Sequence, residues 1–159
     1  PYRRIRPDEH EGNPMADQIV VGIDGSGGGA KALAFAFEEA TRRDADLTGI
    51  YAWHYPTLAA TPAPFGGVPL PPVEEMESAA SEGLDHILES IEVPEGVRFE
   101  GVVREGSPAR VLIEASEDAD LVVVGTRGHG GFTGLVLGSV SQQVVSHAKC
   151  PVVVVPSDD

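Results

Sequence analysis

Short apolar runs rich in β-branched residues limit the possible folds of this chain more than any other feature. The three clearest runs are IVVGI at residues 19–23, LVVVG at residues 121–125 and PVVVV at residues 151–155. Because these runs lack a polar face, they are typical of parallel strands that helices cover on both sides. Two weaker strand patterns, at residues 46–53 and 97–106, lie between the first two runs. The chain therefore predicts five strands.

Between consecutive strand patterns, apolar residues recur with the spacing of an amphipathic helix. These helical segments are expected at residues 30–43, 73–91, 107–117 and about 138–147. Ser107 is the expected N-cap of the third helix, and Val140, Val144 and Val145 are expected to face inward from the fourth. Regular alternation of strands and helices predicts an α/β fold, an open five-stranded parallel sheet with helices on both faces.

The charge of the chain excludes several classes of partner. Eleven basic residues stand against 25 acidic ones, giving a net charge of −14. This balance argues against a broad surface for nucleic acid or for an anionic membrane. Only two of the basic residues, Lys31 and Lys149, are lysines. An acidic, lysine-poor composition fits either a halophilic origin or a GC-rich genome.

Other features of the chain bear on its compartment and its domains. Cys150 is the only cysteine, so an intramolecular disulfide is impossible, which is consistent with a reducing cytosol. No apolar run approaches the roughly 18 residues that span a bilayer. We therefore expect a cytoplasmic protein that contacts neither membranes nor nucleic acid.

A polar, disordered leader or extension is expected at residues 1–14, followed by a single domain at residues 15–157. Six prolines predict an irregular loop at residues 54–72.

The first glycine-rich stretch, GIDGSGGGAK at residues 22–31, follows the first strand. It is not a Walker loop, because Lys31 is followed by alanine and not by serine or threonine. It also lacks the acidic residue that a dinucleotide fingerprint places about 20 residues further on. Its glycines at residues 27–29 are interpreted as permitting a tight strand-to-helix turn. Asp24 at the strand tip is costly to bury without a partner, which indicates a ligand, metal or capping role.

The second glycine-rich stretch has the spacing G-x2-G-x9-G-S, formed by Gly125, Gly128, Gly138 and Ser139. Free backbone N–H groups and the helix dipole at the start of the last helix favour an anion there, and Ser139 and Ser141 would add hydroxyl donors. The alternative is a helix capped by Ser139 behind a flexible loop. If the first and fourth strands are neighbours, both glycine-rich loops face one crevice at the carboxyl edge of the sheet.

These motifs resemble the universal stress protein family, and in particular its ATP-binding branch, which carries G-x2-G-x9-G-[ST]. The resemblance covers residues 18–156 and rests on IVVGIDGS, on residues 105–156 (EGSPARVLIEASEDADLVVVGTRGHGGFTGLVLGSVSQQVVSHAKCPVVVVP) and on the alternation between them. It implies a Rossmann-like sheet in the order 3-2-1-4-5. It also implies a homodimer formed by antiparallel pairing of the last strand, which begins at Pro151 and ends at Val155. ATP is the implied ligand, with Mg²⁺ held mainly by its phosphates.

The resemblance also implies which residues contact the nucleotide. The adenosine side is expected at Gly22, Ile23, Asp24, Ala52 and Val124. The ribose and phosphates are expected at Gly125, Arg127 and Gly128, and the phosphate chain at Gly138, Ser139, Val140 and Ser141. Asp24 could also contact the Mg²⁺ ion, and Arg127 either faces the phosphates or is a solvated loop residue. Where many relatives carry serine, this chain has Gly29, which predicts a more pliant first loop.

No recognised catalytic set accompanies the phosphate motif. Asp24, Arg127 and His129 are the candidates for in-line phosphate chemistry, and they form no recognised pair. The leading interpretation is therefore a dimeric, ATP-dependent regulator of stress response. Three alternatives stay open at this point: slow ATP hydrolysis, a nucleotide-independent dimeric scaffold, and binding of AMP or cyclic AMP in the same crevice.

Overall fold

The computed structural model describes residues 16–55, 71–126 and 137–157. Several predictions fall outside these described residues: the leader at residues 1–14, most of the proline-rich loop, and the roles of Arg127, Gly128 and His129. All other predicted elements and site residues can be compared with the structure.

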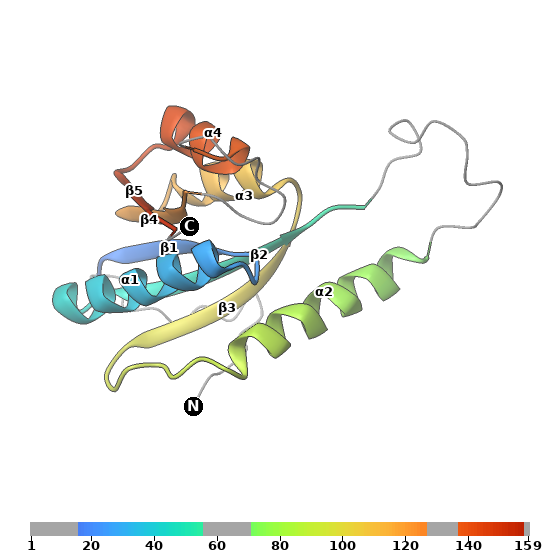
Figure 1. Ribbon diagram of the computed structural model, residues 1–159, viewed down its shortest axis with the longest axis horizontal. Coiled ribbons are helices and arrows are strands. Elements are labelled where there is room, and N and C mark those ends of the chain that lie inside the picture. Colours follow the sequence, from blue (N-terminus) through green and yellow to red (C-terminus); the bar gives the residue numbers. More distant parts are fainter. Residues whose placement is uncertain (1–15, 56–70, 127–136, 158–159) are drawn as a thin grey trace.

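Strands and helices alternate along the chain as predicted. The strands are β1 (Gln18–Ile23), β2 (Asp46–Trp53), β3 (Arg98–Glu105), β4 (Leu121–Gly125) and β5 (Val152–Val155). The helices are α1 (Gly27–Arg43), α2 (Val73–Leu88), α3 (Pro108–Ala115) and α4 (Ser139–His147). Every strand pairs in parallel with its neighbours, and the sheet has the order β3-β2-β1-β4-β5 (Figure 1). The predicted fold class and strand order are confirmed.

Two hydrophobic layers explain why the central strands are apolar at successive positions. Ile19, Val21 and Ile23 of β1 join the core beneath α1 and α2. Val20, between them, joins the opposite core beneath α3 and α4, because successive strand side chains point to opposite faces. Helices α3 and α4 lie on the same face of the sheet, α3 against β1 and β2 and α4 against β5 (Figure 1).

The helix boundaries differ from the prediction at α1. This helix begins at Gly27, three residues before the expected start, and Ser26 is its N-cap. The glycines at residues 27–29 therefore form the first helical turn and not the connection between strand and helix. The interpretation of these glycines as a strand-to-helix turn was wrong in this respect.

The inward face of α4 also differs from the prediction. Val144 is fully buried, whereas Val145 is 48% exposed. Neighbouring helical residues lie about 100° apart around the axis, and α4 is covered by the sheet on one side only. The prediction that Val145 faces inward was therefore wrong.

Helix α2 packs on the sheet through its C-terminal half. Ala80, Leu84 and Leu88 are buried, while Val73 at its start is 44% exposed. Figure 1 shows the N-terminal half of this helix, in green, extending away from the sheet. Of the helices in the described segments, none is long and apolar enough to cross a membrane.

Candidate functional site

A cavity of about 580 Å³ opens at the carboxyl ends of β1, β2 and β4. Ligands of open parallel sheets bind at this edge, next to the point where the strand order reverses. All predicted site residues that the structure describes line this one cavity: Gly22, Ile23, Asp24, Ala52, Val124, Gly125, Gly138, Ser139, Val140 and Ser141. The described parts of the two glycine-rich stretches thus line a single cavity, as the strand order requires.

The two stretches touch through their backbones at Gly28 and Gly125. A Cβ atom at Gly125 would lie 2.8 Å from both the carbonyl carbon and the carbonyl oxygen of Gly28. Only glycine permits this approach, because side-chain carbons essentially never come within 3.0 Å of other heavy atoms. The first turn of α1 is therefore held directly against the end of β4.

The start of α1 is closed by a chain of hydrogen bonds from Asp24. Oδ1 of Asp24 accepts hydrogen bonds from the backbone N of Ser26 (2.9 Å) and from its Oγ (2.6 Å). Oγ of Ser26 in turn accepts from the backbone N of Gly29 (3.0 Å). A Cβ atom at Gly29 would collide with Oδ1 of Asp24. Gly29 therefore makes room for this carboxylate. The sequence analysis predicted a different consequence of this glycine, a more pliant first loop.

The start of α4 has a different structure, because no side chain of the described residues caps it. Its N-cap is Gly138, and its first turn contains no acidic residue. Ser139 is the first helical residue and not the N-cap. The first intrahelical bond runs from the backbone N of Gln142 to the carbonyl of Gly138 (2.9 Å), so the N–H groups of residues 139–141 have no acceptor within the helix. These three residues line the cavity.

Ser141 supports this turn from the inside. It is 2% exposed, and its single hydroxyl proton is shared between the carbonyl oxygens of Thr126 and Gly138, each 3.0 Å from Oγ. Its hydroxyl proton is therefore directed at the backbone, whereas the sequence predicted a hydroxyl donor for the ligand. The free donor that Ser141 retains is its backbone N–H.

The opposite wall of the cavity is apolar. Ile50 of β2 and Val111 and Leu112 of α3 are buried there. The sequence motifs do not single out these residues, and the same holds for three further residues that line the cavity: Tyr51, Pro108 and Thr126. Helical spacing indicates the inner face of α3, but only the sheet order places that face beside the cavity. The complete site combines an apolar wall with an uncapped helix start.

Comparison with known proteins identifies the family. Residues 15–156 match the sequence model of the Universal stress protein family. The chain belongs to this family. Universal stress protein Rv2623 of Mycobacterium tuberculosis is 38% identical over 143 residues, which cover 89% of this chain and 46% of that protein. The chain thus spans about half the length of the curated relatives it matches.

Solved structures of the family agree with the fold of this universal stress protein. UspA from Lactobacillus plantarum has a TM-score of 0.63 at 22% identity, with coverage of 90% of this chain and 99% of that chain. A universal stress protein in complex with cAMP has a TM-score of 0.51 at 27% identity, with coverage of 87% and 95%.

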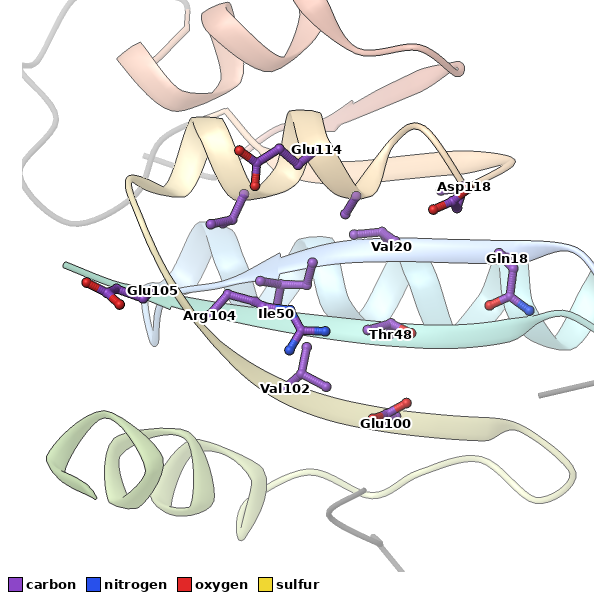
Figure 2. A pocket seen from close by; sticks show the side chains of 13 residues that line it. Gln18, Val20, Thr48, Ile50, Glu100, Val102, Arg104, Glu105, Glu114 and Asp118 are labelled. Atoms are coloured by element: carbon purple, nitrogen blue, oxygen red, sulfur yellow. The ribbon is translucent and has the colours of Figure 1, made fainter. Parts of the chain in front are cut away.

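A second hollow of this universal stress protein, about 310 Å³ in volume, lies between α3 and the strands β1, β2 and β3 (Figure 2). It shares Ile50 and Val111 with the cavity described above. Its described lining contains one guanidinium, that of Arg104, and four carboxylates, those of Glu100, Glu105, Glu114 and Asp118. An anionic ligand is disfavoured there, because the carboxylates outnumber the cation. The acid-free start of α4 is the better anion site.

No group of three or more His, Cys, Asp or Glu side chains that could hold a metal ion occurs among the residues that the structure describes.

Proposed function

We propose that this universal stress protein binds an adenine nucleotide in the cavity, with ATP as its ligand. The observation that carries the proposal is the uncapped, acid-free start of α4 on the cavity wall. Three backbone N–H groups and the positive end of the helix dipole favour a phosphate at that position. The apolar wall formed by Ile50, Val111 and Leu112 suits the base.

The two ends of the cavity suit different parts of such a ligand. The Asp24 carboxylate repels phosphate but accepts hydrogen bonds from hydroxyl and amino groups, as on an adenosine. Gly125 and the first turn of α4 line the part of the cavity where the phosphate chain would lie. Mg²⁺, if bound with ATP, would be held mainly by the phosphates and would neutralise part of their charge. Asp24 is the described cavity residue that could add a carboxylate ligand.

Cyclic AMP and AMP are a second candidate ligand class. The observation that favours them is the relationship, at 27% identity, to a universal stress protein in complex with cAMP. A single phosphate would use the same N–H groups of α4, while the base would use the same apolar wall. Competition between ATP and cAMP for the purified protein separates the two candidates.

We further propose that the protein acts as a homodimer paired through β5. This strand is at the edge of the sheet, and all four of its valines are only half-buried. Exposed apolar edge strands tend to pair with another chain. Occupancy of the cavity would then shift the population of surfaces that other proteins of the stress response recognise. Native mass spectrometry of the freshly purified protein reports the dimer and any retained nucleotide together.

A pair of charge variants at the start of α4 tests the nucleotide site. Ser139→Asp adds a carboxylate on the cavity wall, whereas Gln142→Glu adds one in the same helical turn outside the lining residues. Each added negative charge interacts favourably with the N-terminal end of the helix dipole and stabilises the folded protein by about 0.3–1 kcal/mol. Both variants should therefore be at least as stable as the parent. Calorimetry should show that only Ser139→Asp weakens ATP binding, by tenfold or more. Absence of binding of ATP, AMP and cAMP to the parent protein at millimolar concentration would overturn the proposal.

A further inference from the structure

Thr126 connects the proposed nucleotide site with the C-terminal edge of the sheet. It follows β4 and lines the cavity. Its backbone N donates to the carbonyl oxygen of Val155, the last residue of β5, at 2.9 Å. Its Oγ1 accepts from the backbone N of Ser157 at 3.0 Å and lies 3.1 Å from Oγ of Ser157. One residue thus fixes both the end of the edge strand and the segment that follows it.

The carbonyl oxygen of Thr126 holds the other side of this connection. It accepts a hydrogen bond from the backbone N of Gly138 at 2.7 Å and one from Oγ of Ser141 at 3.0 Å. Gly138 is the N-cap of α4, so this carbonyl sets where the helix begins. It thereby sets the direction of the N–H groups that face the cavity.

We propose that Thr126 is a positioning residue that couples occupancy of the cavity to the order of the β5 edge. The inference rests on the proposed nucleotide site. A ligand on the first turn of α4 would tighten the bonds from Gly138 and Ser141 to the Thr126 carbonyl. This would restrain Thr126, whose N–H and Oγ1 hold Val155 and Ser157. Such coupling is reciprocal, so ordering of the edge also strengthens ligand binding.

Two substitutions at position 126 separate the side-chain contribution from the backbone contribution. Thr126→Val keeps the shape of the residue and its backbone bonds, but it removes the Oγ1 bonds to Ser157. Thr126→Ser retains the hydroxyl and serves as the matched control. Loss of one such bond changes an equilibrium by about 2- to 10-fold.

Hydrogen exchange of the full chain, with and without ATP, tests the proposal, and calorimetry on the same samples measures binding. ATP should slow exchange at the amide of Ser157 in the parent protein and in Thr126→Ser, but not in Thr126→Val. The valine variant should also bind ATP about 2- to 10-fold more weakly. ATP binding without a change at Ser157, or an equal change in Thr126→Val, would overturn the inference.

A ligand-free measurement keeps the inference separate from the nucleotide proposal. In the protein without ATP, Thr126→Val should speed exchange at Ser157 and also at Gly138, whose N–H bonds to the Thr126 carbonyl. Thr126→Ser should restore both amides. A merely local role would change Ser157 alone, and that result would overturn the coupling even if ATP does not bind. Failure of ATP binding with both amides affected would reject only the nucleotide proposal.

Discussion

Replacing Gly125 by alanine tests whether the two glycine-rich loops are joined as tightly as the structure indicates. The added Cβ would lie 2.8 Å from the carbonyl carbon and oxygen of Gly28, which is 0.6 Å inside the 3.4 Å at which ordinary contact begins. Neither side can move freely, because Gly125 pairs with Val155 in the sheet and Gly28 belongs to the first turn of α1. The substitution must therefore displace backbone.

Overpacking of this kind costs about 1–3 kcal/mol. For a chain of this size each kcal/mol lowers the melting temperature by about 2–4 °C, so Gly125→Ala should melt about 2–12 °C lower. Moving β4 away from α1 also changes the cavity that both elements line. Nucleotide affinity should therefore fall as well, by about tenfold for each 1.4 kcal/mol of binding energy lost.

Gly27→Ala is the matched control. A Cβ atom at Gly27 would meet nothing within 4 Å, and alanine is the better helix former by up to about 1 kcal/mol. This variant should be as stable as the parent or slightly more stable. Urea unfolding and calorimetry of both variants measure the two effects. If Gly125→Ala proved as stable as Gly27→Ala and bound nucleotide equally well, the close approach to Gly28 would be wrong.

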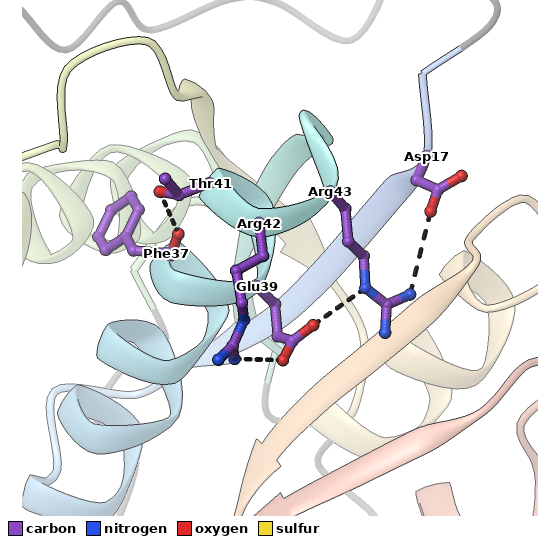
Figure 3. A network of polar contacts seen from close by, with 6 residues as sticks. All are labelled: Asp17, Phe37, Glu39, Thr41, Arg42 and Arg43. Carbon is purple, nitrogen blue, oxygen red and sulfur yellow. Dashed lines mark hydrogen bonds and ion pairs between the residues drawn. The ribbon is translucent and has the colours of Figure 1, made fainter.

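Two further predictions concern titratable groups. Burial raises the pKa of the Glu39 carboxyl, but hydrogen bonds and charge from Arg43 and Arg42 outweigh burial and lower it overall (Figure 3). The stability from these pairs is present above the unfolded pKa of about 4.3 and is lost as pH falls through the lower folded pKa. At pH 7, Glu39→Gln should therefore be less stable than the parent by about 0.2–1 kcal/mol in free energy of unfolding. Between pH 5 and pH 3 the parent should lose more stability than the variant, because only the parent has this carboxylate to protonate. Urea unfolding measures both differences, and equal pH profiles of the two proteins would contradict the prediction. Burial, reinforced by the charge of Asp120, raises the pKa of the Cys150 thiol. A disulfide reagent at pH 8 should label it more slowly than an unstructured thiol, with the difference lost in urea, and equal rates in the folded protein would be evidence against a shielded thiol.

The layered sheet was predictable because its signal is local. Runs such as residues 121–124 are apolar at every position, and only burial on both faces explains that pattern. Features that depend on tertiary contacts were harder to predict from the sequence. Val144 and Val145 are chemically identical, and only the position of the sheet decides that one is buried and the other exposed.

The site was predictable where a residue must be small or must end a strand. Gly125, Gly138 and Asp24 stand out for these reasons, and the strand order brings them together. Ile50, Val111 and Leu112 did not stand out, because an apolar residue that lines a cavity has the same sequence pattern as one that fills a core. The inward direction of the Ser141 hydroxyl depends on the carbonyls of Thr126 and Gly138, which no local pattern reveals.

The two helix starts at the cavity differ in how well they suit an anion. The start of α1 supplies its own acceptor, because Ser26 caps Gly29 and Asp24 holds Ser26. A phosphate there would have to displace this cap and approach a carboxylate. The start of α4 has a glycine N-cap and no acidic residue in its first turn, so among the described residues its donors meet no capping side chain, and the turn itself adds no negative charge. The starts of the two helices therefore differ in electrostatic sign, although each follows a glycine-rich stretch of sequence. The difference lies in one hydroxyl and one carboxylate, not in the number of glycines.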